Sequence, residues 1–307
     1  MKKTLFALIA LAVAATACNK AEVIETTQDN LIGFEAPFVV NATKATDNTY
    51  GATNKLTSFD VYGTVTGTAG TVNIFDGVEV KGTAGTNTVW SYGEQYAQYW
   101  IPGANYSFAA VVDANGVTQD DALKMPTALT YNTAGQKDLL YATASVTNAT
   151  ATQAAVNFTF AHLLSKAHFT VTSNTAGGYS HTVKDITVSN FETGTYTIAN
   201  GTWAGVTDTN IEFGAVENVT AATGALTNET EMLLIPNAAK FNVTFTVELA
   251  KGGVVLGSET KNIEVDTDLV KGNAYNFTIA CSVGNQIQFT VTADPTWSTP
   301  TTDVEVQ

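Results

Sequence analysis

Cys18 is the residue whose chemistry the sequence specifies most closely. The chain begins with Lys2 and Lys3, continues with an apolar run from Leu5 to Ala15, and has small residues just before Cys18. A basic start, a short apolar run and small residues predict a secretory signal peptide that is too short to span a bilayer permanently. A cysteine directly after such a signal is typical of bacterial lipoproteins, in which the cysteine carries fatty acyl chains such as palmitate. We therefore expect residues 1–17 to be removed and Cys18 to be lipidated; the alternative is an ordinary secretory signal followed by a chance cysteine.

The remaining nucleophiles and metal-binding side chains are few. His162 and His168 lie six residues apart, so on one unbroken strand they would be about 20 Å apart and could not share a metal ion. Cys281 shares a strand face with Phe277 and Ile279, which predicts a buried small side chain rather than a nucleophile. No phosphate-binding loop, nucleophile elbow, zinc-protease motif or paired-cysteine motif occurs. The sequence therefore predicts no enzymatic activity, no cofactor and no metal.

The tryptophans offer a different chemistry, because indole rings stack on sugars. The four are Trp90, Trp100, Trp203 and Trp297. Packing in a core or sheet is the commoner use, and residues 90–92 and 99–103 read as a hairpin with an aromatic seam. A surface carbohydrate-binding lipoprotein stays open as the alternative function, and an exposed tryptophan cluster would favour it.

Composition limits the partners. The formal net charge is −14 and becomes −16 when Lys2 and Lys3 leave with the signal, and the chain contains no arginine. An acidic, arginine-free chain lacks the basic surface that nucleic acid requires. Thr, Asn, Gly and Val are abundant, which is typical of an exported β protein.

The hydrophobic pattern predicts an all-β fold. Short alternating runs separated by turn residues recur along the chain, as at residues 59–63, 106–111 and 241–247, and Gly252-Gly253 predicts a hairpin turn. The alternation changes phase near Leu164, which indicates a bulge or a passage between sheets. We place a domain boundary there, giving residues 18–160 and 161–307, each the size of one sandwich.

Seven short segments in a fixed order resemble the fimbrillins, the lipoprotein-borne subunits of Bacteroidetes-type (type V) pili. They are residues 59–63, 74–80, 90–92, 99–110, 138–142, 160–166 and 272–277. The resemblance covers nearly the whole mature chain and rests on the ordered set, not on one motif. It implies two tandem transthyretin-like (Ig-like) β-sandwich domains.

The resemblance also implies that proteolysis after a basic residue frees the first strand, and that the emptied groove accepts a strand from the next subunit. The first strand would be residues 31–40, and the cleavage would fall between Lys44 and Ala45. Lys44 stands where many relatives carry arginine, so the processing protease stays open and a trypsin-like or lysine-accepting enzyme fits. The alternative is that Lys44 is a solvated loop residue.

Two C-terminal segments alternate as a donor strand should. One carries Ile287, Phe289 and Val291, and the other carries Val304 and Val306. The first is slightly preferred, because residues 299–302 read as flexible.

We expect a fimbrial subunit of the stalk with a role in adhesion and biofilm formation. It would be attached to the outer membrane through its lipid before cleavage and displayed at the cell surface in the fimbria afterwards. Its partners would be other copies, anchor and tip subunits, and the protease.

Overall fold

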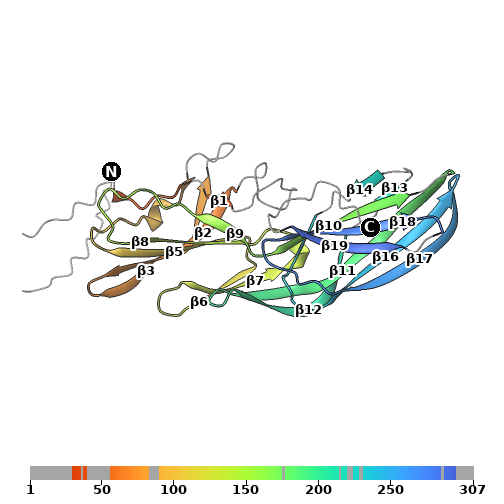
Figure 1. Cartoon of the computed structure of the whole chain (residues 1–307). Coiled ribbons are helices and arrows are strands. Elements are labelled where there is room, and N and C mark those ends of the chain that lie inside the picture. The colour runs from red at the N-terminus through yellow and green to blue at the C-terminus, as the bar shows by residue number, and fades with distance from the viewer. Residues whose placement is uncertain are drawn as a thin grey trace, which may run out of the picture.

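Alternating apolar and polar residues form strands along almost the whole described chain. The computed structural model describes residues 30–35, 37–39, 56–82, 90–174, 177–213, 216–219, 224–227, 231–284 and 287–294. These residues contain strands and short 3-10 turns but no α-helix, and none of their helical turns is long and apolar enough to cross a membrane. The predicted all-β fold is confirmed. Figure 1 shows an elongated molecule with the early strands at one end and the late strands at the other.

The first sheet holds most strands of the N-terminal half. Its order is β1-β9-β8-β5-β2-β3-β4. The strands are β1 (Phe38–Val39), β2 (Ser58–Gly67), β3 (Gly70–Gly82), β4 (Trp90–Ser91), β5 (Asn105–Val112), β8 (Leu140–Val146) and β9 (Thr159–His162). All described pairs in it are antiparallel except β1 with β9, which is parallel.

The second sheet belongs to the C-terminal half and has the order β14-β10-β18-β19, with β15 pairing to β10. Its strands are β10 (Ser165–Asn174), β14 (Gly224–Thr227), β15 (Met232–Leu234), β18 (Ala274–Ser282) and β19 (Gln288–Asp294). Among the described strands β19 is therefore at an edge of this sheet. Phe277, Ile279 and Cys281 alternate inward along β18 and are buried, as their spacing predicted.

The third sheet combines both halves of the chain. Its main order is β17-β16-β11-β7-β6, and β12 and β13 also pair with β11. The strands are β6 (Gly116–Gln119), β7 (Pro126–Asn132), β11 (Tyr179–Thr197), β12 (Thr202–Glu212), β13 (Val216–Val219), β16 (Phe241–Lys251) and β17 (Val254–Val265). The predicted turn at Gly252-Gly253 joins β16 to β17, and both glycines have the positive φ that a tight hairpin requires.

The phase change near Leu164 is a passage between sheets. β9 ends at His162 in the first sheet, and β10 begins at Ser165 in the second. Leu163 and Leu164 between them are buried. The division of the chain at residue 160 stays a prediction, and β6 and β7, which precede that residue, pair within the sheet that β11 and β16 build.

Three apolar cores follow one another along the molecule. The first is rich in aromatic rings and lies within the first sheet, from Ile32 to Phe160. The third lies between the second and third sheets, around Phe169, Phe245 and Phe277. A middle core joins them, because the outer face of β2 and β5 packs against β7, β11 and residues 163–164.

Candidate functional site

The N-terminal segment, defined as residues 30–35 and 37–39, closes the first sheet. On one side it forms antiparallel bridges from Leu31 to Tyr99 and from Phe34 to Trp90. On the other side Phe34 forms a parallel bridge with Val156, and β1 continues this pairing along β9. β1 belongs to the segment itself, and without it the first sheet ends in β9 on one side and β4 on the other. The segment therefore occupies a slot between these two sides of the sheet.

The wall at residues 156–160 holds the segment through main-chain hydrogen bonds. The Val156 N–H donates to the Gly33 carbonyl at 2.8 Å, and the Glu35 N–H donates to the Val156 carbonyl at 3.0 Å. Farther along, the Phe38 N–H donates to the Phe158 carbonyl at 3.0 Å. The segment is thus bonded to this wall as a sheet strand is.

The opposite wall holds the segment through both main-chain and side-chain hydrogen bonds. The Ile32 N–H donates to the Gln98 carbonyl, and the Trp100 N–H donates to the Asn30 carbonyl, both at 2.8 Å. The Ile32 carbonyl accepts a hydrogen bond from the Tyr92 hydroxyl at 2.7 Å. Burial raises the pKa of Tyr92 to about 12, so this hydroxyl keeps its proton and remains a donor at neutral pH.

Three apolar side chains of the segment enter the first core. Ile32, Phe34 and Val39 are buried, whereas Leu31 and Phe38 are 39% and 62% exposed. Phe38 therefore does not fill the slot. Neighbouring strand residues point to opposite faces, and Val39, which pairs with Phe160, takes the inward position.

Phe34 is the centre of an aromatic cluster. Its ring centroid lies 5.7–6.3 Å from those of five rings, edge-on to four of them and stacked on Phe158. The other four are Phe59, Phe75, Tyr92 and Phe108. Such pairs stabilise beyond the burial of apolar area alone, so removing the segment would leave a ring-lined cavity.

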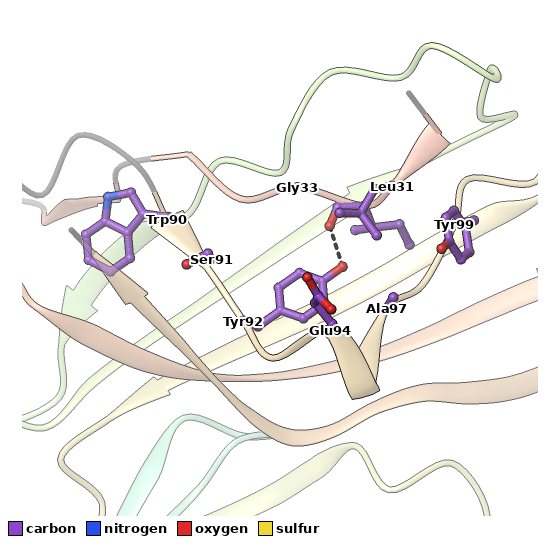
Figure 2. A pocket seen from close by; sticks show the side chains of 9 residues that line it. Leu31, Gly33, Trp90, Ser91, Tyr92, Glu94, Ala97 and Tyr99 are labelled. Atoms are coloured by element: carbon purple, nitrogen blue, oxygen red, sulfur yellow. Dashed lines mark hydrogen bonds between the residues drawn. The ribbon is translucent and has the colours of Figure 1, made fainter. Parts of the chain in front are cut away.

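A hollow of about 500 Å³ lies beside the segment, where the opposite wall departs from it. The main chain of residues 91–97, which includes the 3-10 turn η2 (Glu94–Tyr96), loops away between the two antiparallel bridges. Figure 2 shows Tyr92 and Glu94 next to the Leu31–Gly33 stretch, with Tyr99 at one end and Trp90 at the other. Residues 90–92 and 99–103 thus do not form the predicted hairpin, because the described partner of Tyr99 is Leu31 and those of Trp90 are Phe34 and Gly82.

Several predicted site residues fall outside the described residues. They are Cys18, Lys44, Ala45, Val304 and Val306. Their roles stay predictions.

Among the other donor candidates, Phe289 and Val291 lie in β19 of the second sheet, and Ile287 directly precedes this strand. Phe289 in β19 stacks on Phe245 and Phe277 with centroid distances of 6.0 and 6.1 Å. Ile287 and Val291 are partly buried against the same core. These three side chains therefore pack against the third core.

The histidines have structural surroundings. His162 Nδ1 lies 2.8 Å from Asp138 Oδ2, and His181 Nδ1 lies 2.9 Å from Ser173 Oγ. His168 is fully buried, and among the described residues neither ring nitrogen has a hydrogen-bond partner. Within the described ranges no group of three or more His, Cys, Asp or Glu side chains could hold a metal ion.

Cys281 and the described tryptophans also lie in packed surroundings. Cys281 is buried, and burial raises its thiol pKa to about 11. Trp90 and Trp100 are buried, and the Trp203 indole N–H donates to the Leu163 carbonyl at 2.8 Å. Trp297 lies outside the described residues. The three described tryptophans do not form an exposed sugar-binding face.

Comparison with known proteins identifies the class of molecule that carries this slot. The sequence profile of the fimbrillin-like family matches residues 43–295, so the chain belongs to that family. This membership supports a fimbrial subunit displayed at the cell surface, and the family is structural rather than enzymatic. No curated protein matches the sequence.

Solved structures share the fold. A crystal structure of a fimbrial protein from Bacteroides vulgatus is 14% identical, with a TM-score of 0.60 over 87% of this chain and 99% of that one. A candidate cell adhesion protein from Bacteroides uniformis is 16% identical, with a TM-score of 0.53 over 89% and 100% of the two chains. A third, from Bacteroides ovatus, is 14% identical, with a TM-score of 0.52 over 86% and 96%.

Proposed function

We propose that the chain is a stalk subunit of a fimbria, exported as a lipoprotein and polymerised by proteolysis-triggered strand exchange. The observation that carries this proposal is the slot. Ile32 and Phe34 are buried in this slot, and the segment that carries them ends shortly before Lys44. A strand placed there by another subunit would satisfy the same main-chain groups and the same ring-lined pocket.

Cleavage after Lys44 changes how the segment is held. In the intact chain the segment is covalently attached and meets its slot at a high effective concentration. After cleavage, residues 18–44 form a separate peptide that only non-covalent contacts retain. Burial of each large apolar side chain such as Ile32 or Phe34 contributes about 1.5–3 kcal/mol before association costs. A competing strand at sufficient concentration can then replace it.

The pairing of β19 supports the other C-terminal segment as the donor. Donation by β19 would break seven paired positions with β18 and uncover Phe277 and Phe245. A donor placed after Asp294 leaves this pairing intact. We therefore favour the final segment with Val304 and Val306, whose spacing matches that of Ile32 and Phe34.

Lipidation of Cys18 holds the precursor at the outer membrane until cleavage. More than one acyl chain is needed for lasting attachment, and a lipidated N-terminal cysteine carries several. Cleavage at Lys44 separates the anchor from the body of the subunit, as a stalk position requires. Labelling with a radioactive fatty acid tests the site, and Cys18→Ala protein that labels fully would exclude it.

The polymerisation test treats purified unlipidated precursor, which lacks the signal peptide, with trypsin. Size exclusion and electron microscopy then follow the mass and shape of the products. We expect ladders of high-mass species after cleavage and none before it. Lys44→Ala is the matched variant, because it removes the cleavage site and leaves the slot unchanged. Polymerisation of the Lys44→Ala protein at the parent rate would exclude the cleavage step.

A further inference from the structure

We infer that the incoming donor segment of a second copy first binds in the hollow beside Ile32 and displaces the N-terminal segment from that end. This inference rests on the strand exchange proposed above. It adds the order of events and the surface on which exchange begins.

The N-terminal segment is held by different kinds of hydrogen bond on its two sides. Gly33, Glu35 and Phe38 bond through main-chain groups to the wall at residues 156–158. On the side of the hollow, main-chain bonds join Ile32 to Gln98 and Asn30 to Trp100, but the Ile32 carbonyl accepts from the Tyr92 hydroxyl. Rotation of the Tyr92 side chain would free this carbonyl for an incoming main chain without moving either wall, so we place the first contact of the donor on this side.

The hollow suits an apolar side chain on an extended chain. Its walls include the rings of Tyr92 and Tyr99, and Gly33 contributes no side chain to fill it. Leu31 and Tyr99 at its mouth are 39% and 38% exposed, so the hollow is reachable while the segment is still in place. The hollow is therefore accessible in the state from which exchange must begin.

The hollow is continuous with the slot, which favours a strand over a small ligand as its occupant. Ile32 and Gly33 both line the hollow and belong to the segment to be displaced. A donor residue seated beside Ile32 places its next residues along the same path. Every second side chain of a strand points to the same face. Each inward-facing side chain of the segment that leaves the slot is therefore replaced by the next inward-facing side chain of the donor, two residues farther along the donor.

The experiment measures release of the cleaved segment. Unlipidated chain beginning at Cys18 carries a fluorophore on that thiol, because Cys281 is buried and has a pKa raised to about 11. A site for a sequence-specific protease replaces residues 43–46. After cleavage, a synthetic peptide of residues 284–307, which spans both donor candidates, is added in increasing excess, and release is followed by fluorescence anisotropy.

Displacement through the hollow predicts a release rate that rises linearly with peptide concentration above the peptide-free rate. Ala97→Phe fills the hollow from its lining, and we expect it to lower this slope by about tenfold, the factor expected from part of one side-chain burial. The slope of each variant is measured above the peptide-free rate of that same variant. Gln95→Phe is the matched control, because it adds the same ring to the same loop but outside the lining of the hollow, and it should keep the parent slope. Ala97→Leu fills the hollow with a smaller side chain and is used if the phenylalanine prevents folding.

The contrary results are distinct. A release rate independent of peptide concentration means that the segment leaves before the donor arrives and overturns the inference. A parent slope in both Ala97 variants, or an equal slope with a scrambled peptide, also overturns it. If the peptide never occupies the slot even after the segment has left, strand exchange itself fails and not only its starting point.

Discussion

The ring of Phe34 lies stacked on the ring of Phe158, with centroids 6.0 Å apart and planes 13° from parallel. The contact joins the N-terminal segment to the wall that also bonds its main chain. One side chain thus links the segment to the aromatic core of the first sheet.

Replacing Phe34 with alanine should destabilise the precursor by about 3–5 kcal/mol, because a buried ring is lost and a cavity remains. Phe38→Ala in the same segment should change stability by less than about 0.5 kcal/mol, since that ring is exposed. Denaturant unfolding of both variants measures the difference. Equal losses would mean that Phe34 does not anchor the segment.

Gly63 tests the wall behind Phe34. A Cβ at this position would lie 2.9 Å from Phe108 Cδ1 and 3.0 Å from Phe75 Cδ2, and both rings contact Phe34. Gly63→Ala should therefore cost about 1–3 kcal/mol by overpacking. Gly67→Ala in the same strand is the control, because nothing lies within 4 Å of its added Cβ. Circular dichroism melts that showed the two variants equally stable would contradict the packing.

Because His168 is buried, we expect acid to lower the folding stability of the C-terminal half. Burial lowers its pKa from 6.5 to about 4, with Glu231 acting to raise it and Lys166 to lower it further. The unfolded chain binds a proton more readily, so stability is full above pH 6.5 and falls as the pH drops toward 4. Between pH 7 and 5 the loss from this residue should be about 2 kcal/mol.

The matched variant for this prediction is His168→Leu, which cannot titrate. Unfolding midpoints at pH 7 and 5 should lie closer together in the variant than in the parent. The pKa of His181 is also lowered by burial, so a smaller dependence of the same sign should persist. An unchanged pH dependence in His168→Leu would show that this imidazole is not the group responsible.

Truncation separates the two donor candidates. A chain ending at Asp294 keeps β19 on β18, so its unfolding should match that of the full chain, but after cleavage it should form no fibres. Fibres from this chain would move the donor role to β19. Fibres from a chain ending at Val283 would remove the C-terminus as donor altogether. Electron microscopy of the cleaved proteins gives the answer.

The sequence pattern predicted the structural features that depend on residues close together in the sequence. The Gly252-Gly253 turn and the break in the strand near Leu164 follow from turn chemistry and from the change of phase in the alternation. The sequence did not predict the hollow, because Trp90 and Tyr99 find their partners in a segment about sixty residues away and not in each other. Nor did it place β6 and β7 beside β11, since strand pairing at that separation is specified by the middle core and not by local propensity.

Strand exchange requires that assembled subunits have lost the N-terminal segment. N-terminal sequencing and peptide mass spectrometry of fimbriae sheared from the cell surface measure this loss. We expect subunits that begin at Ala45 and yield no peptide containing Ile32 or Phe34. Fibre subunits that begin at Cys18 and retain both residues would contradict strand exchange.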